Sequence, residues 1–245
     1  MNSRPLVITG AGGGIGHTLV DDLLTRGYTN IACQYRSDSP GLRQVMAKHN
    51  KNFDAYCFQA DLTDEVQVAE LRHRAISTLG SVWGLINLAG ASTNAMSWKM
   101  TLADFKKIID ANLTTTFLTC REFTPDMRAA GGGRIINTSS VVAATGTAGA
   151  AHYCAAKAGI IGFTRALAVE LANKNVTANA LALGYFETGL ITHLSPALQQ
   201  DIKDKTPLKR FGHVSEIAGL VDFLLGDAGA FTTGQVIHMN GGIHL

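Results

Sequence analysis

Long stretches of one charge sign and long apolar runs are both missing from this chain of 245 residues. Its formal net charge is only +2, and like charges form no extended run. The chain therefore has no electrostatic feature that would attract nucleic acid or an anionic membrane surface. No apolar run reaches the roughly 20 residues that a membrane-spanning helix needs. We expect neither nucleic acid nor a membrane among its partners.

Cysteines and histidines form none of the patterns expected of redox or metal sites. The four cysteines contain no C-x-x-C pair, and Cys33 and Cys57 fall inside apolar segments that predict buried strands. Free thiols, as in a reducing cytosol, are expected rather than disulfides. The eight histidines show no H-x-H or H-x-x-x-H spacing, so no metal site is predicted. Because Gly10 stops the first apolar run early, no signal peptide is indicated, and we expect a cytoplasmic protein.

Charged residues make up only 16% of the chain, against 46% hydrophobic residues. This balance fits an α/β protein whose parallel sheet is covered on both faces. Strand-like and helix-like segments alternate throughout, and linkers, repeats and low-complexity segments are absent. Such alternation implies a doubly wound parallel sheet with helices on both faces. The length suits one domain over residues 1–245.

Apolar periodicity predicts where these elements lie. Strands are expected at residues 6–9, 30–35, 54–60, 83–88, 134–137, 176–182 and 233–239. Helices are expected before Gly27 and at residues 41–49, 63–79, 102–130 (capped by Thr101), 153–173 and 214–225. Residues 189–204 have mixed polarity and weak periodicity, and with their neighbours they predict a mobile substrate lid around residues 185–212.

A glycine cluster occupies the first strand-to-helix junction, where residues 9–16 read TGAGGGIG. Glycines let the backbone turn tightly and approach a pyrophosphate, and the helix N-terminus offers free N–H groups. This context predicts a dinucleotide site. The predicted contacts are Gly10, Gly12, Gly13, Gly14, Ile15 and Gly16.

The end of the second predicted strand bears on which dinucleotide binds, and residues 34–38 read QYRSD. Arg36 could pair with a 2′-phosphate and Ser37 could add a hydroxyl, which favours NADP. Asp38 is the residue type that binds the ribose hydroxyls of NAD, so NAD stays open. Arg36 could also be an ordinary solvated loop residue.

Three further strand exits supply candidate cofactor contacts. Asp61, followed by Leu62, could accept a hydrogen bond from the adenine amine or equally cap the next turn. Small residues after the fourth strand would let the cofactor pass over the strand ends, and Thr188 could bind the nicotinamide carboxamide. The predicted contacts are Asp61, Leu62, Asn87, Ala89, Gly90, Gly184 and Thr188.

Tyr153 and Lys157 lie four residues apart at the start of an Ala-rich helical segment. Positions four apart share one face of a helix, so the ammonium can approach the phenol. We expect this to lower the pKa of Tyr153 from about 10, so that the phenol exchanges a proton with a carbonyl or alcohol oxygen. Ser140, at a strand exit, could polarise the same oxygen. Asn112, unusual inside a helix, could hold a water for proton relay or simply be exposed.

Together these motifs resemble the short-chain dehydrogenase/reductase family over essentially the whole chain. The resemblance is carried by TGAGGGIG, by NLAG at residues 87–90, by Asn112 and Ser140, and by YCAAK at residues 153–157. It implies a seven-stranded Rossmann fold, a homotetramer, and a catalytic tetrad of Asn112, Ser140, Tyr153 and Lys157. It also implies that Tyr153 and Lys157 contact the cofactor.

Within the family the chain is most similar to the 3-oxoacyl acyl-carrier-protein reductases, through RIIN, TPLKRFG and HMNGG. This likeness implies NADPH-dependent reduction of a 3-oxoacyl thioester in fatty acid biosynthesis, with an acyl carrier protein as partner. Two alternatives are an NAD(P)-dependent dehydrogenase of a sugar, polyol, steroid or other secondary alcohol, and a non-catalytic cofactor-binding protein. A serine hydrolase is disfavoured because no G-x-S-x-G is present.

The chain departs from the family pattern at four places. Leu88 replaces the second Asn of Asn-Asn-Ala-Gly, and Leu183 replaces the Pro of Pro-Gly. Residues 12–13 are glycines where NADP-dependent members often carry a basic residue. Residues 131–133 are also glycines, where carrier-protein reductases often carry basic residues. That leaves Arg128 and Lys174 as candidate carrier contacts.

Overall fold

The computed structural model describes residues 3–188, 191–192 and 194–245. Its strands form one seven-stranded sheet in the order β3-β2-β1-β4-β5-β6-β7, and every neighbouring pair is parallel. The strands are β1 (Leu6–Thr9), β2 (Ile31–Tyr35), β3 (Cys57–Gln59), β4 (Gly84–Asn87), β5 (Gly133–Ser140), β6 (Val176–Leu183) and β7 (Val236–Met239). The helices are α1 (Gly14–Thr25), α2 (Pro40–Lys48), α3 (Phe53–Tyr56), α4 (Glu65–Leu79), α5 (Leu102–Ile109), α6 (Thr115–Ala130), α7 (Val142–Thr145), α8 (Ala151–Leu171), α9 (Pro196–Lys205) and α10 (Val214–Leu225).

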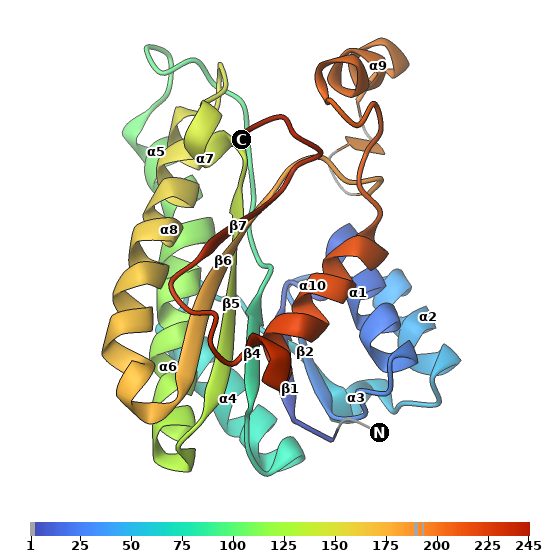
Figure 1. The fold of residues 1–245 in the computed structure, drawn as a ribbon, viewed down its shortest axis with the longest axis vertical. Helices are drawn as coiled ribbons and strands as arrows, with labels where there is room; N and C mark the ends of the chain where they lie inside the picture. The colour runs from blue at the N-terminus through green and yellow to red at the C-terminus, as the bar shows by residue number, and fades with distance from the viewer. Residues whose placement is uncertain (1–2, 189–190, 193) are drawn as a thin grey trace.

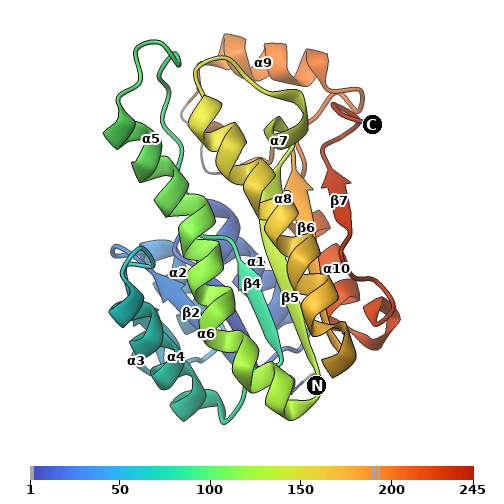
Figure 2. The same ribbon diagram turned by 90° about the vertical axis from the view of Figure 1, so that its left-hand side faces the viewer.

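Helices cover both faces of the sheet, as the amino-acid pattern predicts. Figure 1 shows α1, α2 and α10 on one side and α4, α6 and α8 on the other, and Figure 2 shows α6 and α8 side by side over the strands. Each layer packs on its own apolar cluster. One contains Leu19, Leu23, Ile217 and Val221, and the other contains Val68, Leu71, Phe123 and Leu171. The predicted single-domain Rossmann fold is therefore confirmed.

The strand order reverses between β1 and β4, which places a crevice at the carboxyl ends of these two strands. The chain leaves β1 toward β2 and β3 on one side, then returns to β4 and continues through β5, β6 and β7 on the other. In such sheets ligands bind outside the carboxyl ends at this switch point. The fold alone thus indicates where the site should be sought.

The long helical segment predicted from residue 102 to 130 is divided by a wider turn. A π-helical stretch, Asp110–Thr114, separates α5 from α6 and contains the fully buried Asn112. The predicted cap at Thr101 is confirmed, because its hydroxyl accepts from the amide of Asp104 in a capping box. π-Helical turns often mark functional sites, and this one turns an asparagine side chain inward.

The predicted third strand is wrong in its first half. Residues 53–56 form the short helix α3, and only residues 57–59 join the sheet. The Asn52 side chain accepts a hydrogen bond from the amide of Ala55 at 3.2 Å, which starts a helical turn. The Phe53 ring packs against the Tyr35 ring, with centroids 5.5 Å apart. Capping and aromatic packing therefore outweigh the strand propensity of this segment.

The segment predicted to be a lid contains a helix, which weak periodicity did not reveal. Ser195 accepts from the amide of Leu198, and Pro196 occupies the first turn, which together start α9. Figure 2 shows α9 crossing the end of the molecule that also carries the C-terminus. Residues 189, 190 and 193 of this segment lie outside the described residues. Across the described ranges, no helix is both long and apolar enough to cross a bilayer.

Candidate active site

A cavity of about 270 Å³ opens at the switch point between β1 and β4. It is formed by the segments that leave β1, β2, β3 and β4 at their carboxyl ends, together with the π-helical turn. Of the predicted cofactor contacts, Gly10, Gly12, Gly13, Arg36, Ser37, Asp61, Leu62, Ala89 and Gly90 line this cavity. Sequence positions far apart in the chain are thus brought to one edge of the sheet.

The glycine cluster is shaped by close backbone contacts. Gly10 has a φ of 67°, and a Cβ there would lie 2.7 Å from the amide nitrogen of Ala89. Gly13 caps α1 without any side-chain hydrogen bond, and no acidic residue lies in the first helical turn. The first amides of α1 are therefore free for an anion, and the helix dipole favours negative charge there.

Gln34 connects the glycine cluster to the end of β3, a role that our sequence reasoning missed. Its side chain is buried, Oε1 accepts from the amide of Gly10 at 2.8 Å, and Nε2 donates to the Ala60 carbonyl at 2.7 Å. A glutamine inside an otherwise apolar strand was the available signal. The contact holds two walls of the cavity at a set separation.

Arg36 and Asp38 differ in how they are engaged. The guanidinium of Arg36 is exposed and has no hydrogen-bond or ion-pair partner among the described residues. Asp38, in contrast, accepts from Nε of Arg43 at 3.1 Å. Asp61 caps the next turn, since its Oδ1 accepts from both the amide and the hydroxyl of Thr63, and these bonds lower its pKa. The predicted turn cap at Asp61 is thus observed, and its contact with the adenine amine stays a prediction.

Asn87 faces the interior rather than the cavity. Its Nδ2 donates to Oδ1 of Asn137 at 2.9 Å, and its Oδ1 accepts from the hydroxyls of Thr119 at 2.9 Å and Thr9 at 3.3 Å. The side chain therefore joins β1, β4, β5 and α6 beneath the site. A cofactor could reach only the backbone of this residue.

Asn112 and Lys157 meet beside Gly90 at the end of the cavity. A Cβ on Gly90 would lie 2.5 Å from Oδ1 of Asn112 and 3.5 Å from Nζ of Lys157. Nδ2 of Asn112 donates to the carbonyls of Ala91 at 2.7 Å and Ile108 at 2.9 Å, whereas its buried Oδ1 has no hydrogen-bond partner among the described residues. Of the two alternatives for Asn112, exposure is wrong, because the side chain is buried, and its role in holding a water stays a prediction.

Lys157 is buried, at 3% exposure, and its Nζ donates to the Thr138 carbonyl at 2.8 Å. Burial lowers the pKa of this ammonium to about 8. Its Nζ lies 5.5 Å from the centroid of the Tyr153 ring, so the two side chains do share a helix face. The carbonyl of Thr138, which the sequence did not single out, fixes where the ammonium points.

The expected low pKa of Tyr153 is not found. Burial raises the pKa of its phenol to about 12, against a smaller lowering by a hydrogen bond from Ser140. The ammonium of Lys157 is directed at the Thr138 carbonyl, and burial outweighs its proximity. Ser140, at the end of β5, and Tyr153, on the first turn of α8, therefore lie close enough for the hydroxyl to lower the pKa of the phenol, which burial nevertheless holds neutral.

Several predicted contacts do not line the 270 Å³ cavity. Gly14, Ile15 and Gly16 form the first turn of α1 beside it. Gly184 faces the end of β7, where a Cβ would lie 2.6 Å from Cα of Asn240. The amide of Thr188 donates to the Phe186 carbonyl at 2.7 Å within the following loop. Leu183 extends β6 alongside Met239 and so sets the direction of this exit.

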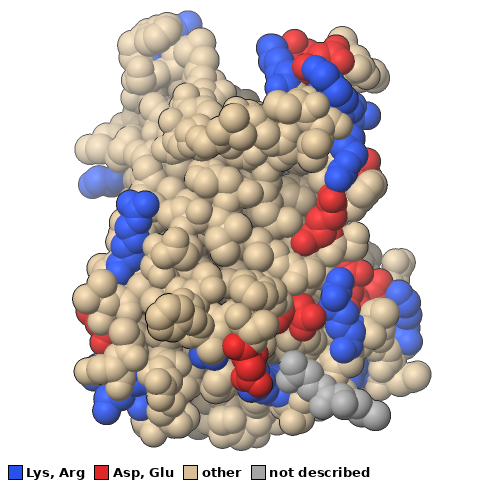
Figure 3. All heavy atoms as spheres, in the orientation of Figure 1, with Lys and Arg blue, Asp and Glu red and all other residues tan. Residues whose placement is uncertain are grey.

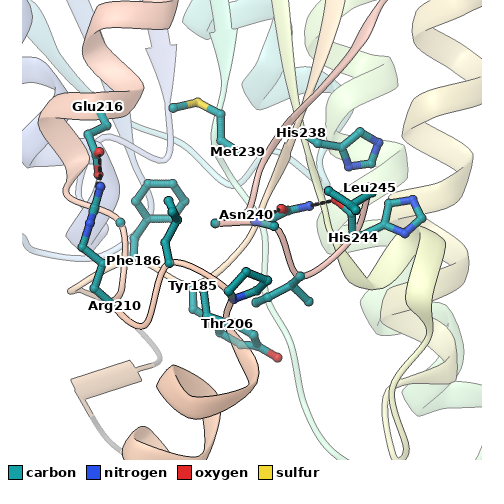
Figure 4. A pocket seen from close by; sticks show the side chains of 16 residues that line it. Tyr185, Phe186, Thr206, Arg210, Glu216, His238, Met239, Asn240, His244 and Leu245 are labelled. Atoms are coloured by element: carbon teal, nitrogen blue, oxygen red, sulfur yellow. Dashed lines mark hydrogen bonds and ion pairs between the residues drawn. The ribbon is translucent and has the colours of Figure 1, made fainter.

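A second cavity of about 650 Å³ lies between the predicted lid, residues 185–212, and the C-terminal residues 238–245 (Figure 4). Apolar side chains dominate its wall, with the Arg210–Glu216 ion pair at one side and His238 and His244 at the other, as Figure 4 shows. Tyr185 lines it and also raises the pKa of Tyr153 electrostatically, which places the two tyrosines near one another. The larger cavity thus begins close to the catalytic candidates.

Comparison with known proteins agrees with this geometry. Residues 4–199 match the family described as short chain dehydrogenase. The chain is 35% identical to the 3-oxoacyl acyl-carrier-protein reductase FabG of Staphylococcus aureus strain Mu50, with 99% of both chains covered. It is 36% identical to the same enzyme of Staphylococcus epidermidis, with both chains fully covered.

Two further relatives carry different names. Nodulation protein G of Azospirillum brasilense is 35% identical, covering 100% of this chain and 99% of that protein. A crystal structure of a candidate short-chain alcohol dehydrogenase from Sinorhizobium meliloti 1021 superposes with a TM-score of 0.90 at 32% identity, covering 99% of this chain and 97% of that one. The fold, the matched residues and these full-length likenesses agree: the chain belongs to the short-chain dehydrogenase family and is an oxidoreductase.

Proposed function

We propose that this protein is an NADPH-dependent reductase that converts a 3-oxoacyl thioester, carried by an acyl carrier protein, to the 3-hydroxy product. The observation that carries the proposal is the arrangement of Ser140, Tyr153, Lys157 and Asn112 beyond the end of the 270 Å³ cavity, which we call the dinucleotide cavity. The likeness to two 3-oxoacyl acyl-carrier-protein reductases over the full chain supports this choice of substrate.

The residues present fit a nicotinamide dinucleotide. The uncapped N-terminus of α1 suits a pyrophosphate. Gly10 lies so close to Ala89 that no side chain fits at position 10, so the backbone there is open to the cofactor. Arg36, unpaired within the described ranges, suits the 2′-phosphate of NADP. When bound, the cofactor supplies the hydride. Lys157 would hold its ribose, and Gly184 and Thr188 would adjoin the nicotinamide.

Ser140 and Tyr153 would act on the carbonyl oxygen of the substrate. Because burial raises the pKa of Tyr153 to about 12, the phenol carries its proton at neutral pH. It can therefore donate that proton as negative charge develops on the oxygen, while the Ser140 hydroxyl donates a second hydrogen bond. The ammonium of Lys157 would favour the phenolate that results. A phenol kept protonated supports the reductive direction.

Asn112 would hold a water that returns the proton to Tyr153. Its Oδ1 is buried and unpartnered, and it lies near Nζ of Lys157, because both atoms approach the same face of Gly90. A buried polar oxygen of this kind normally binds a partner, often an ordered water. A water here would connect the ammonium to the exit of the site.

The acyl chain would occupy the 650 Å³ cavity beneath the lid, residues 185–212. Tyr185 lines this cavity and is close enough to Tyr153 to raise the pKa of that phenol, and the wall also includes Phe186, Pro207 and Met239. Apolar surface of this kind suits an aliphatic chain, which gains free energy by leaving water. A polar sugar would gain much less from the same wall.

Docking of an acyl carrier protein needs a surface near the site. Arg128 and Lys174 are exposed, but Arg128 lies in the last turn of α6 and Lys174 follows α8, at the opposite end of the sheet from Tyr153. The eight residues of β5 alone span roughly 25 Å between the two ends. A carrier bound at Arg128 would therefore face away from this chain's own Tyr153. On the face in Figure 3, lysines and arginines over α9 are interspersed with acidic residues.

A homotetramer is the assembly we propose, as expected of the family. Exposed apolar side chains support a helical interface: Phe105 on α5 is 37% exposed, Phe117 on α6 43%, and Val169 on α8 82%. Apolar residues left this exposed on one helical layer favour burial against another subunit. The molecular mass in solution, measured by light scattering, tests this assembly.

A second candidate is an NAD(P)-dependent dehydrogenase of a secondary alcohol. It is favoured by the likeness to the candidate alcohol dehydrogenase from Sinorhizobium meliloti and by Asp38 in the cavity wall. Asp38 is already paired with Arg43, which leaves it less free to bind a ribose. Measuring NADH- and NADPH-linked rates in both directions with acyl thioesters, sugars and steroids separates the two candidates.

The test is consumption of NADPH with acetoacetyl-CoA as the 3-oxoacyl substrate, in wild-type protein, Tyr153→Phe and Tyr56→Phe. We expect turnover in the wild type, loss of at least about a thousandfold in Tyr153→Phe because the proton donor is removed, and unchanged NADPH affinity. Tyr56 lies on α3, away from Ser140, and controls for removing a phenol. Near-full activity in Tyr153→Phe would sink the assignment.

A further inference from the structure

His152 is a fully buried imidazole directly before Tyr153 on the first turn of α8. Its Nε2 lies 3.1 Å from Oγ1 of Thr93, a hydrogen bond in either tautomer. Its Nδ1 is buried and has no hydrogen-bond partner in the part of the chain that the structure describes. An apolar side chain would fill the same space without leaving a polar atom unsatisfied. Burying the imidazole therefore costs free energy, and its hydrogen bond to Thr93 is the feature to explain.

Thr93 belongs to the loop that leaves β4, and this loop carries much of the site. Its first residues, Leu88 to Ala91, line the dinucleotide cavity. The Ala91 carbonyl accepts from Nδ2 of Asn112 at 2.7 Å. Two residues further on, Thr93 meets His152. The loop thus joins the dinucleotide cavity and Asn112 to the helix that carries Tyr153.

A second bond fastens the same loop to the segment before α8. The amide of Ala95 donates to the Gly149 carbonyl at 2.8 Å, and Gly149 has a φ of 79°. The loop is therefore held before Thr93 by the bond between Ala91 and Asn112, and after Thr93 by the bond between Ala95 and Gly149. The Thr93–His152 contact lies between them and, within the described part of the chain, is the only hydrogen bond between side chains across this junction.

We propose that His152 is a positioning residue, which through Thr93 sets the distance between Tyr153 and the loop that bears the cofactor contacts and Asn112. The proposal rests on the proposed carbonyl reduction, since it assigns Tyr153 as proton donor. His152 itself touches no reacting atom. Its loss should therefore lower the rate of the chemical step and leave cofactor affinity in place, because misplacement acts on the transition state.

Four single variants and one double variant, Thr93→Val with His152→Phe, test this. Thr93→Val and His152→Phe each remove the hydrogen bond while keeping bulk, and His152→Gln can return a donor to the position of Nε2. Thr124→Val is the matched control, since Thr124 makes one helical bond, to the Cys120 carbonyl, on α6. We expect Thr93→Val and His152→Phe to lower kcat about tenfold to a hundredfold, with the Kd for NADPH unchanged.

The double variant and the rescue distinguish positioning from a general loss of packing. Because both changes delete one contact, the double variant should be no slower than the worse single variant. His152→Gln should recover most of the rate, and Thr124→Val should match the wild type. Wild-type kcat in Thr93→Val, additive losses in the double variant, or failure of His152→Gln to recover the rate would overturn the proposal.

Amide hydrogen exchange supplies a readout that does not depend on turnover. The Ala95 amide reports on attachment of the loop, since it donates to Gly149. Its exchange should become at least about tenfold faster in Thr93→Val and His152→Phe, and stay unchanged in Thr124→Val. Unchanged exchange at Ala95 in all variants would refute the role of His152. If exchange at Ala95 becomes faster in these variants as expected, but the wild-type protein reduces no carbonyl substrate, only the proposed function is refuted.

Discussion

Gly90 and Asn112 lie so close that a Cβ on the glycine would stand 2.5 Å from Oδ1 of the asparagine. The two residues come from different segments, the exit of β4 and the π-helical turn, and Lys157 is 3.5 Å from the same point. No side chain fits there unless Asn112 moves. Movement would break its bonds to the carbonyls of Ala91 and Ile108.

Gly90→Ala should therefore reduce activity far more than its size suggests. Overpacking typically costs about 1–3 kcal/mol, and the same amount in a transition state is about a tenfold to a hundredfold loss of rate. We expect kcat/KM to fall within this range, with a modest drop in Tm. The measurement is steady-state reduction alongside calorimetry. Activity equal to the wild type would show that Asn112 can shift freely.

The same change to alanine at Gly162 should have the opposite effect and stabilise the protein. This glycine lies exposed inside α8, without positive φ, and a Cβ there would meet nothing within 4 Å. Alanine in a helix is favoured over glycine by roughly 0.5–1 kcal/mol. Gly162→Ala should raise the free energy of unfolding by about that amount, seen in urea titration, and leave turnover unchanged. A loss of stability would mean that another subunit packs against this position.

Arg36 and Asp38 should contribute unequally to cofactor preference. The guanidinium is unpaired within the described part of the chain, whereas Asp38 is bound to Arg43. Charge-assisted bonds contribute about 1.5–3 kcal/mol, so Arg36→Ala should lower the kcat/KM ratio of NADPH to NADH about tenfold to a hundredfold. Asp38→Asn, the control, should change this ratio little. An unchanged ratio in Arg36→Ala would remove the case for NADP.

Local patterns predicted the parts of this molecule that depend on local spacing. The shared face of Tyr153 and Lys157 and the cap at Thr101 follow from helix geometry, and both are observed. The alternation of strands and helices likewise predicted the parallel sheet. Residues 54–56 were misassigned because aromatic residues suit strands as well as short capped turns, and the packing of Phe53 against Tyr35 decides between them.

Properties that depend on burial could not be read from spacing. The pKa of Tyr153 was expected to fall because Lys157 is near, but it rises because the phenol is buried and the ammonium points at Thr138. His152 and Gln34 were missed for a related reason. Each is an ordinary polar residue until the fold places it against Thr93 or Gly10.

The pH dependence of reduction should be set by Lys157 at its alkaline end. Burial lowers the pKa of this group to about 8, and the pKa of Tyr153 is about 12. Below pH 8 the ammonium is charged and can favour the developing phenolate. Above pH 8 it loses its proton while the phenol keeps its own. We expect kcat/KM to be level at neutral pH and to fall above about pH 8; a level profile to pH 10 would contradict this.

The same buried ammonium should also affect stability, with a sign that can be worked out. The pKa of Lys157 is lowered from 10.5 to about 8 in the folded state, so the unfolded chain binds more protons between these two values. Stability therefore rises with pH across this window, by up to about 1.4 kcal/mol per pH unit. Below pH 8 both states are protonated and the contribution is constant.

Lys157→Met isolates this contribution, because every other titrating group is common to both proteins. The free energy of unfolding of the wild type, minus that of Lys157→Met, should increase between pH 8 and pH 10 and be level between pH 6 and pH 7.5. Above pH 10 the raised pKa of Tyr153 adds a term of opposite sign, and this term does not cancel because removing Lys157 changes the surroundings of the phenol, so the comparison ends there. Urea titrations at each pH measure the difference. A difference that does not change with pH would mean that the ammonium is solvated in the folded protein, and the proposed alkaline limit on activity would then need another group.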